Sequence, residues 1–160
     1  MSDVTETTQI GRLDRLEALE DIRVLKACYC RYLDTKDWQG FSSLFTRDAE
    51  LCFPEGSPEW LSIDTLMGAI GQMLGGGISV HHVHSPEITF SGNDEATGIW
   101  AMQDRLFFPP GVQGLHDASR IFGAGHYHES YRRVDGRWLF SRIRLTRLHL
   151  AIEEQPRTVT

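Results

Sequence analysis

The second half of this chain contains almost nothing but long strand patterns joined by turn sequences, and this constrains the fold most. After a helix-breaking run of three glycines at residues 75–77, alternating apolar and polar side chains predict four strands, at residues 79–90, 96–108, 119–134 and 137–150. The turn sequences at residues 91–94 and 135–136 predict hairpins, which require antiparallel pairing. The fold therefore contains a large antiparallel sheet whose strands are long enough to curl.

The first half predicts helices that must cover one face of that sheet. Apolar residues recur at helical spacing over residues 13–33, in a helix about 30 Å long. A second, shorter helix has one apolar side made of Trp38, Phe41, Leu44 and Phe45. A strand at residues 49–53 and a third helix, capped by Ser62 and running to Leu74, follow. The predicted fold class is α+β: a curved antiparallel sheet wrapped around N-terminal helices in a cone, with a cavity for a small molecule inside.

Length and composition indicate one soluble globular domain. The chain has 160 residues, 41% of them hydrophobic and 24% charged. We expect the domain at residues 12–150, between a frayed N-terminus (1–11) and a C-terminal tail (151–160). A formal charge of −6 argues against nucleic acid as a partner, and no apolar run is long enough to span a membrane. Because three helices cannot cover both faces of such a sheet, we also expect self-association, as a homodimer or homotrimer.

The cysteine pattern indicates a reducing compartment. Cys28, Cys30 and Cys52 are odd in number, and their spacing fits neither a zinc site nor a redox CxxC motif. With no secretory signal in the sequence, we expect a cytoplasmic protein without disulfides.

Asp34 is a carboxylate at the end of the long first helix, where the helix dipole disfavours negative charge. One explanation is local: Asp34 caps the second helix, with Asp37 in the capping-box position. The other is chemical: Asp34 pairs with an imidazole from the run at residues 81–84. A carboxylate bonded to an imidazole makes a general base that works near neutral pH. The residues alone leave the two explanations equally supported.

Strand alternation does not settle which histidine faces the interior. Simple alternation places His82 and His84 on the same face as apolar Ile88 and so predicts that these two point inward and His81 outward. Pro86 interrupts this pattern, because a proline in a strand commonly marks a bulge, and one extra residue reverses the facing.

A metal site is a competing interpretation, which we rank below the Asp–His pair. His82-x-His84 and His126-x-His128 each place two imidazoles on one strand face, so two such strands predict a four-nitrogen cluster. Glu129 or His116 would add a further ligand.

Four motifs carry a resemblance to a known family. Residues 32–38 (YLDTKDW), 44–49 (LFTRDA), 80–84 (VHHVH) and 125–131 (GHYHESY) resemble SnoaL-like members of the NTF2-like superfamily. The pattern is most similar to the scytalone dehydratase and hexachlorocyclohexane dehydrochlorinase group, and this resemblance implies a cone-shaped fold. It also implies an aspartate–histidine dyad in the cavity, at Asp34 and His81.

The same resemblance shows departures at four positions. Tyr29 stands where the dehydrochlorinase has a lysine, and Ile143, flanked by Arg142 and Arg144, stands near the position of its arginine. Leu33 and Phe53 stand where the dehydratase has tyrosines. The base is kept while its polar partners differ, so neither substrate carries over.

We therefore predict a cofactor-independent lyase or isomerase of dehydratase, dehydrohalogenase or cyclase type, with His81 as general base oriented by Asp34. The expected ligand is apolar, cyclic or aromatic, and no metal is expected. The predicted pocket wall is Tyr29, Tyr32, Phe53, Trp60, Met102 and Tyr127. The alternatives are a non-catalytic binding module, similar to the small subunits of ring-hydroxylating dioxygenases, and the histidine-rich metal site.

Overall fold

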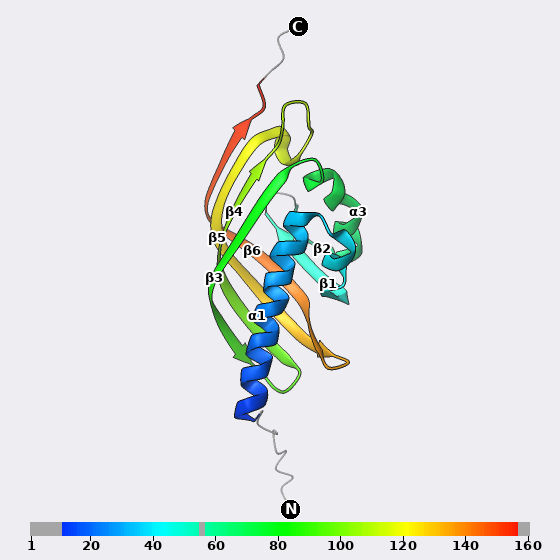
Figure 1. Cartoon of the computed structure of the whole chain (residues 1–160), viewed down its shortest axis with the longest axis vertical. Helices are drawn as coiled ribbons and strands as arrows, with labels where there is room; N and C mark the ends of the chain where they lie inside the picture. Colours follow the sequence, from blue (N-terminus) through cyan, green and yellow to red (C-terminus); the bar gives the residue numbers. More distant parts are fainter. Residues whose placement is uncertain (1–10, 55–56, 157–160) are drawn as a thin grey trace, which may run out of the picture.

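The computed structural model describes residues 11–54 and 57–156, which form three helices and a six-stranded curved sheet (Figure 1). The elements in chain order are α1 (Arg12–Thr35), α2 (Trp38–Ser42), β1 (Phe45–Phe53), β2 (Ser57–Ser62), α3 (Ile63–Leu74), β3 (Ile78–Phe90), β4 (Glu95–Phe107), a short 3₁₀ turn η1 (Leu115–Asp117), β5 (Ala118–Val134) and β6 (Arg137–Glu154). The predicted α+β fold is confirmed. The predicted frayed start lies, apart from Gly11, outside the described residues, as do residues 157–160.

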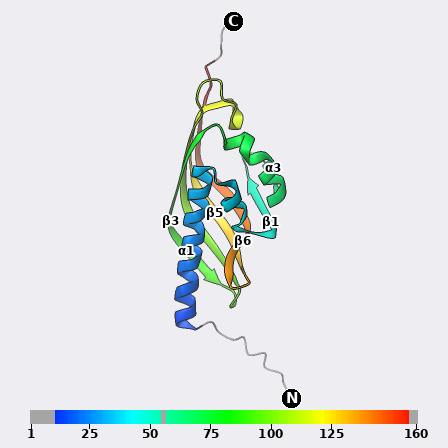
Figure 2. The ribbon, with the colours of Figure 1, turned by 45° about the vertical axis from the view of Figure 1, so that its right-hand side comes forward.

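The sheet has the strand order β2-β1-β6-β5-β4-β3 and curves around α1 (Figures 1 and 2). Strands β3 to β6 form the predicted antiparallel succession. The hairpin at Asp135-Gly136 is confirmed, since both residues have the positive φ that a tight hairpin turn needs. The last strand continues to Glu154, four residues beyond its predicted end.

The early strands correct the prediction in two ways. First, β1 pairs with β6 in parallel, so the sheet is not antiparallel throughout. Second, strand structure replaces helix at Phe45, and β2 is a strand that was not predicted. Aromatic residues at positions 41 and 45 suit a helix stripe, but the backbone of Phe140 donates a hydrogen bond to the Leu44 carbonyl at 2.9 Å. Pairing with β6 therefore overrides the local helical pattern.

Asp34 lies in the last turn of α1, and other residues form the caps where α1 ends and α2 begins. Lys36 adopts the left-handed conformation (φ 63°), and the N–H groups of Lys36 and Asp37 bond back to the carbonyls of Leu33 and Tyr32. The cap of α2 is Asp37, whose carboxylate accepts the Gly40 N–H at 2.8 Å. Of the two explanations for Asp34, capping of α2 is therefore wrong, because Asp34 lies within the last turn of α1 and Asp37 occupies the N-cap position.

The core lies between α1 and the concave face of the sheet. Its α1 residues include Ala18, Ile22, Leu25, Tyr29 and Leu33. Leu13 and Leu16, which continue the predicted stripe, are 68% and 64% exposed, so the first turns of α1 do not bury their apolar side chains. None of the described helices is long and apolar enough to cross a membrane.

A bulge in β3 decides which histidine faces the core. The pairing of β3 with β4 shifts register between His84 and Glu87, and Ser85 at the shift has φ 35°. N-terminal to this bulge, His81 is buried while His82 and His84 are exposed. The expectation from simple alternation is therefore wrong, because the extra residue reverses the facing of everything before it.

Candidate active site

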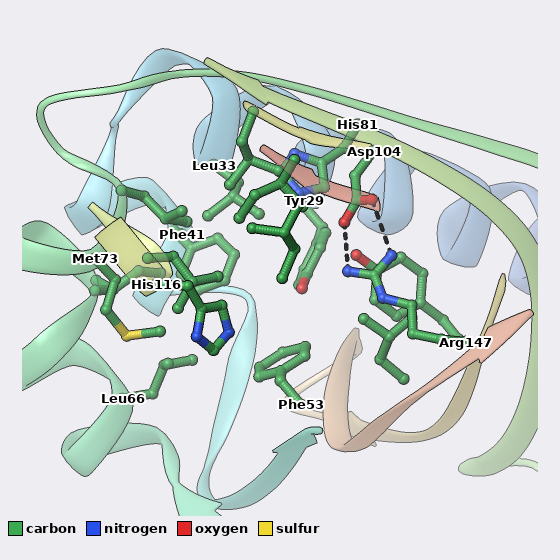
Figure 3. Close-up of a pocket in the computed structure, with 18 residues that line it drawn as sticks. Tyr29, Leu33, Phe41, Phe53, Leu66, Met73, His81, Asp104, His116 and Arg147 are labelled. Carbon is green, nitrogen blue, oxygen red and sulfur yellow. Dashed lines mark hydrogen bonds and ion pairs between the residues drawn. The ribbon is translucent and has the colours of Figure 1, made fainter. Parts of the chain in front are cut away.

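A mostly apolar cavity lies between the helices and the concave face of the sheet (Figure 3). Its apolar wall is made by side chains of α1, α2, α3 and the inner faces of the strands, among them Leu33, Phe41, Phe53, Leu66, Ile70, Met73, Leu106, Ile121 and Leu145. The polar groups that reach it are few: Tyr29, His81, Asp104, His116, Tyr127 and Arg147. A concave apolar site with a small number of converging polar groups is the usual form of a small-molecule site.

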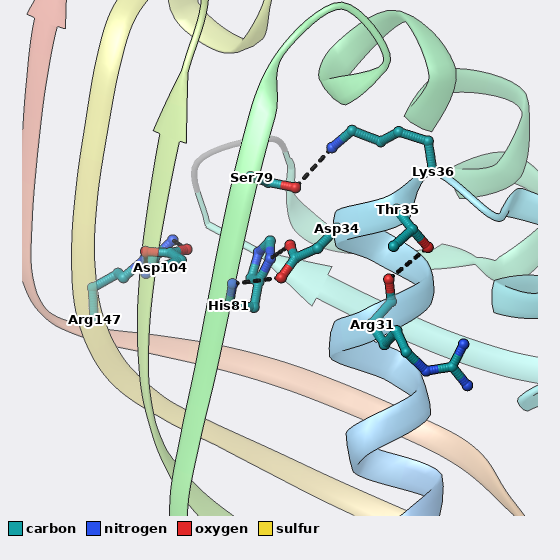
Figure 4. A network of polar contacts seen from close by, with 8 residues as sticks. All are labelled: Arg31, Asp34, Thr35, Lys36, Ser79, His81, Asp104 and Arg147. Atoms are coloured by element: carbon teal, nitrogen blue, oxygen red, sulfur yellow. Dashed lines mark hydrogen bonds and ion pairs between the residues drawn. The ribbon is translucent and has the colours of Figure 1, made fainter.

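His81 and Asp34 are joined by two hydrogen bonds at the wall of this cavity (Figure 4). The ring Nδ1 of His81 lies 2.6 Å from Asp34 Oδ1, and the backbone N–H of His81 donates to Oδ2 at 2.8 Å. The side chains are 6% and 22% exposed, respectively. His81 lines the cavity and Asp34 lies behind it, so the carboxylate holds the proton on Nδ1 and leaves Nε2 as the basic nitrogen.

The surroundings of Asp34 favour its ionised form. Burial opposes ionisation, but the hydrogen bonds from the ring and backbone of His81 outweigh it and hold the pKa of Asp34 below its ordinary value. Next to it, Lys36 Nζ donates to Ser79 Oγ at 2.7 Å, and burial lowers the pKa of this lysine. Asp34 is therefore a carboxylate at neutral pH, able to stabilise a protonated His81.

A second ion pair lines the cavity next to His81. Asp104 is the cross-strand partner of His81 and accepts two hydrogen bonds from the Arg147 guanidinium, at 2.9 and 2.8 Å (Figure 3). The pair passes over Gly123, where a Cβ atom would lie 2.2 Å from both Arg147 Nη1 and Asp104 Oδ1. Asp104 therefore reaches the cavity as one half of an ion pair with Arg147.

His116 reaches the cavity from η1, the turn that joins β4 to β5. Its side chain is exposed, so it stands where the cavity meets solvent. In Figure 3 its ring lies near Leu66, Met73 and Phe53, on the side of the cavity away from Arg147.

The model of the SnoaL-like domain matches residues 14–144, most of the chain. The chain belongs to the SnoaL-like family. The probable cyclase FGR4 of Gibberella zeae is 27% identical over 143 residues, which cover 83% of this SnoaL-like chain and 93% of the cyclase.

Solved structures show the same fold. A type 2 hexachlorocyclohexane dehydrochlorinase (LinA) superposes with a TM-score of 0.75 at 19% identity, covering 93% of this chain and 100% of the other. A putative scytalone dehydratase from Novosphingobium aromaticivorans gives 0.74 at 18% identity, covering 94% and 99%. The predicted NTF2-like cone is thereby confirmed for this SnoaL-like domain.

Three of the six predicted wall residues line the cavity of the SnoaL-like domain: Tyr29, Phe53 and Tyr127. The other three do not. Trp60 of β2 stacks against the guanidinium of Arg142, 3.7 Å from the ring centroid, in a separate surface groove. Met102 faces the core, where its sulfur lies 3.5 Å from Arg147 Nη1, and Tyr32 packs at the edge of the core beside Arg31. The structure therefore corrects the prediction that Tyr32, Trp60 and Met102 form part of the pocket wall.

The departure from the family pattern at Ile143 leaves no cation in the cavity at that position. Ile143 is fully buried in the core, and its neighbours Arg142 and Arg144 are exposed. The cation in the cavity is Arg147, four residues further along β6. Sequence reasoning missed both Arg147 and Asp104. The available signal for Asp104 was its place in the inward alternation of Trp100, Met102 and Leu106.

The predicted histidine cluster does not form. His84 and His126 both pair with Ala101 from opposite sides, so β4 separates them by two strand spacings, roughly 10 Å. Among the residues that the structure describes, no group of three or more His, Cys, Asp or Glu side chains could hold a metal ion. His116, considered above as an extra ligand, instead belongs to the cavity.

Proposed function

We propose that this SnoaL-like protein is a lyase or isomerase that removes a proton from carbon in an apolar, ring-containing small molecule. His81 acts as the general base and Asp34 orients it. The observation that carries this proposal is the 2.6 Å contact between His81 Nδ1 and Asp34 Oδ1, on a histidine whose ring lines an apolar cavity.

The geometry supports a short sequence of events. Asp34 keeps the His81 proton on Nδ1, so Nε2 takes the proton from a substrate carbon. The resulting imidazolium lies beside the Asp34 carboxylate, in surroundings where an ion pair is stronger than in water. The apolar wall excludes water and positions a ring-shaped substrate. The proton passes only between substrate and imidazole, so the proposal calls for no metal or cofactor.

The names of the relatives support the reaction class. One is a probable cyclase, and the proteins of known structure are a dehydrochlorinase and a putative scytalone dehydratase. Loss of HCl, loss of water and ring closure can all begin with removal of a proton from carbon, the step that the Asp34–His81 pair is built to perform.

Ring opening of a nitro-substituted benzisoxazole tests the base without knowledge of the natural substrate. A base removes the ring C–H, the N–O bond breaks, and a coloured cyanophenolate is released. We expect the wild-type protein to accelerate this reaction and His81→Ala to lower kcat/KM by roughly 10²-fold or more. Asp34→Asn should also slow it, because an amide N–H facing Nδ1 would force the ring proton onto Nε2.

His82→Ala is the matched control. His82 is the next residue of the same strand, but it is exposed on the opposite face, so its loss should leave the rate unchanged. Circular dichroism would confirm that each variant folds. Equal rates for wild type and His81→Ala would refute the general base. Probe binding without turnover would support the non-catalytic binding module instead.

A further inference from the structure

We propose that His116 is the second proton-transfer group of this cavity, donating a proton to the oxygen that leaves or becomes an alkoxide while His81 removes the carbon-bound proton. This inference rests on the proposed function, because it needs a reaction that His81 starts. His116 is the other imidazole that lines the cavity within the described residues, and it comes from a different part of the fold.

The backbone around His116, whose side chain lines the cavity, has an unusual conformation. His116 and Asp117 have φ of 59° and 50°, a left-handed conformation that residues other than glycine seldom adopt. Such strain persists only where the surroundings enforce it, and it clusters at functional sites.

Gln155, the residue that follows β6, supplies that support. The Gln155 side chain donates hydrogen bonds to the carbonyls of Phe108, Pro109 and Ala118, at 3.2, 3.3 and 3.2 Å. Its backbone N–H donates to the carbonyl of Asp117 at 3.1 Å. Both ends of the β4–β5 connection are thus tied to one residue. At the centre, Gly114 packs so closely on Phe108 that a Cβ atom would lie 2.2 Å from the ring.

The two imidazoles have complementary surroundings. His81 is buried, and its Nδ1 is engaged by Asp34. The His116 side chain is exposed, and among the described residues its ring has no hydrogen-bond partner. A ring at the mouth can therefore offer an N–H to a bound ligand and recover a proton from water between turnovers.

The proton balance is complete with these two groups. His81 Nε2 takes the proton from carbon, the electron pair of the C–H bond forms the new π bond, and the bond to the leaving oxygen breaks. The His116 imidazolium gives its proton to that oxygen. His81 then releases a proton to water and His116 takes one up, so the net change is elimination of the protonated leaving group.

Two probes with different leaving groups separate an acid from a bystander. The nitro-substituted benzisoxazole releases a weakly basic phenolate that needs little protonation, whereas unsubstituted benzisoxazole releases a more basic one. We expect His116→Asn to lower kcat tenfold or more on the unsubstituted probe and less than about threefold on the nitro probe. Asparagine tolerates the left-handed backbone and can hydrogen-bond, but it cannot transfer a proton at neutral pH. His116→Gln should show the same selectivity, and His128→Ala, an exposed histidine on β5, should show no loss.

The outcomes distinguish the two proposals. If His81→Ala abolishes both reactions while His116→Asn changes neither, or changes both equally, the base stands and the acid role of His116 is overturned. If His81→Ala changes neither reaction, or the wild type accelerates neither, the proposed function fails and this inference fails with it. Urea unfolding of each variant would show that the loss is not one of folding.

Discussion

Replacing Lys26 with methionine should destabilise the protein strongly, because it breaks an ion pair at the centre of the core. Lys26 Nζ on α1 lies 2.5 Å from Glu129 Oε1 on β5, and both side chains are 0% exposed. The other oxygen of Glu129 accepts a hydrogen bond from the Tyr131 hydroxyl, which in turn accepts one from Trp100 Nε1 at 2.8 Å. Removing the ammonium leaves a buried carboxylate without its counter-ion.

The expected loss is about 3–5 kcal/mol, the usual cost of breaking a buried pair from one side. Part of it comes from Tyr29 and Tyr127, whose ring centroids lie 4.0 and 3.6 Å from the ammonium and which both line the cavity. Against a total stability of about 5–15 kcal/mol, such a loss is large. Urea unfolding followed by tryptophan fluorescence would show it as a lower midpoint with an unchanged slope.

Two further variants test the reasoning. The double variant Lys26→Met with Glu129→Gln should be more stable than Lys26→Met alone, because no buried charge is then left unpaired. Arg23→Ala removes an exposed pair with Glu20 at 3.7 Å, 55% and 67% exposed, and should cost less than about 1 kcal/mol. A loss below about 1 kcal/mol in Lys26→Met, or additive losses in the double variant, would refute this account.

Three other predictions follow from the site and its surroundings. The pKa of Asp34 is lowered on folding, so the stability that this carboxylate contributes is present above about pH 4 and is lost as the pH falls through its folded pKa. The urea midpoint of the wild type should therefore exceed that of Asp34→Asn at neutral pH, and this difference should shrink on acidification. Gly123→Ala should displace the ion pair beside His81 and cost about 1–3 kcal/mol, whereas Gly92→Ala, with open space around it, should be neutral by the same assay. Burial raises the pKa of the Cys30 thiol to about 11, so a thiol reagent at neutral pH should label the half-buried Cys28 before Cys30. Rapid labelling of Cys30 in a Cys28→Ser variant would contradict this.

Much of the fold follows from local patterns. The hairpin turns, the glycine run after α3 and the alternation in β3 to β6 specify an antiparallel sheet, because turn geometry and side-chain periodicity act between residues close in sequence. β1 was harder to predict. Phe45 fits a helix stripe as well as a strand, and the choice depends on β6, about a hundred residues away.

Part of the candidate site likewise follows from the sequence, and part depends on the tertiary structure. By itself the sequence determined that a carboxylate ends α1, that histidines lie early in β3, and, through the family resemblance, that Asp34 and His81 form a pair. The tertiary structure placed the bulge between His84 and Glu87, at the Pro86 that interrupts the alternation, and this extra residue turns His81 inward. It also brought Asp104, Arg147 and His116 to one cavity from three separate segments. Sequence patterns report the alternation of side chains along a strand, whereas register shifts and the curvature of the sheet determine which faces meet.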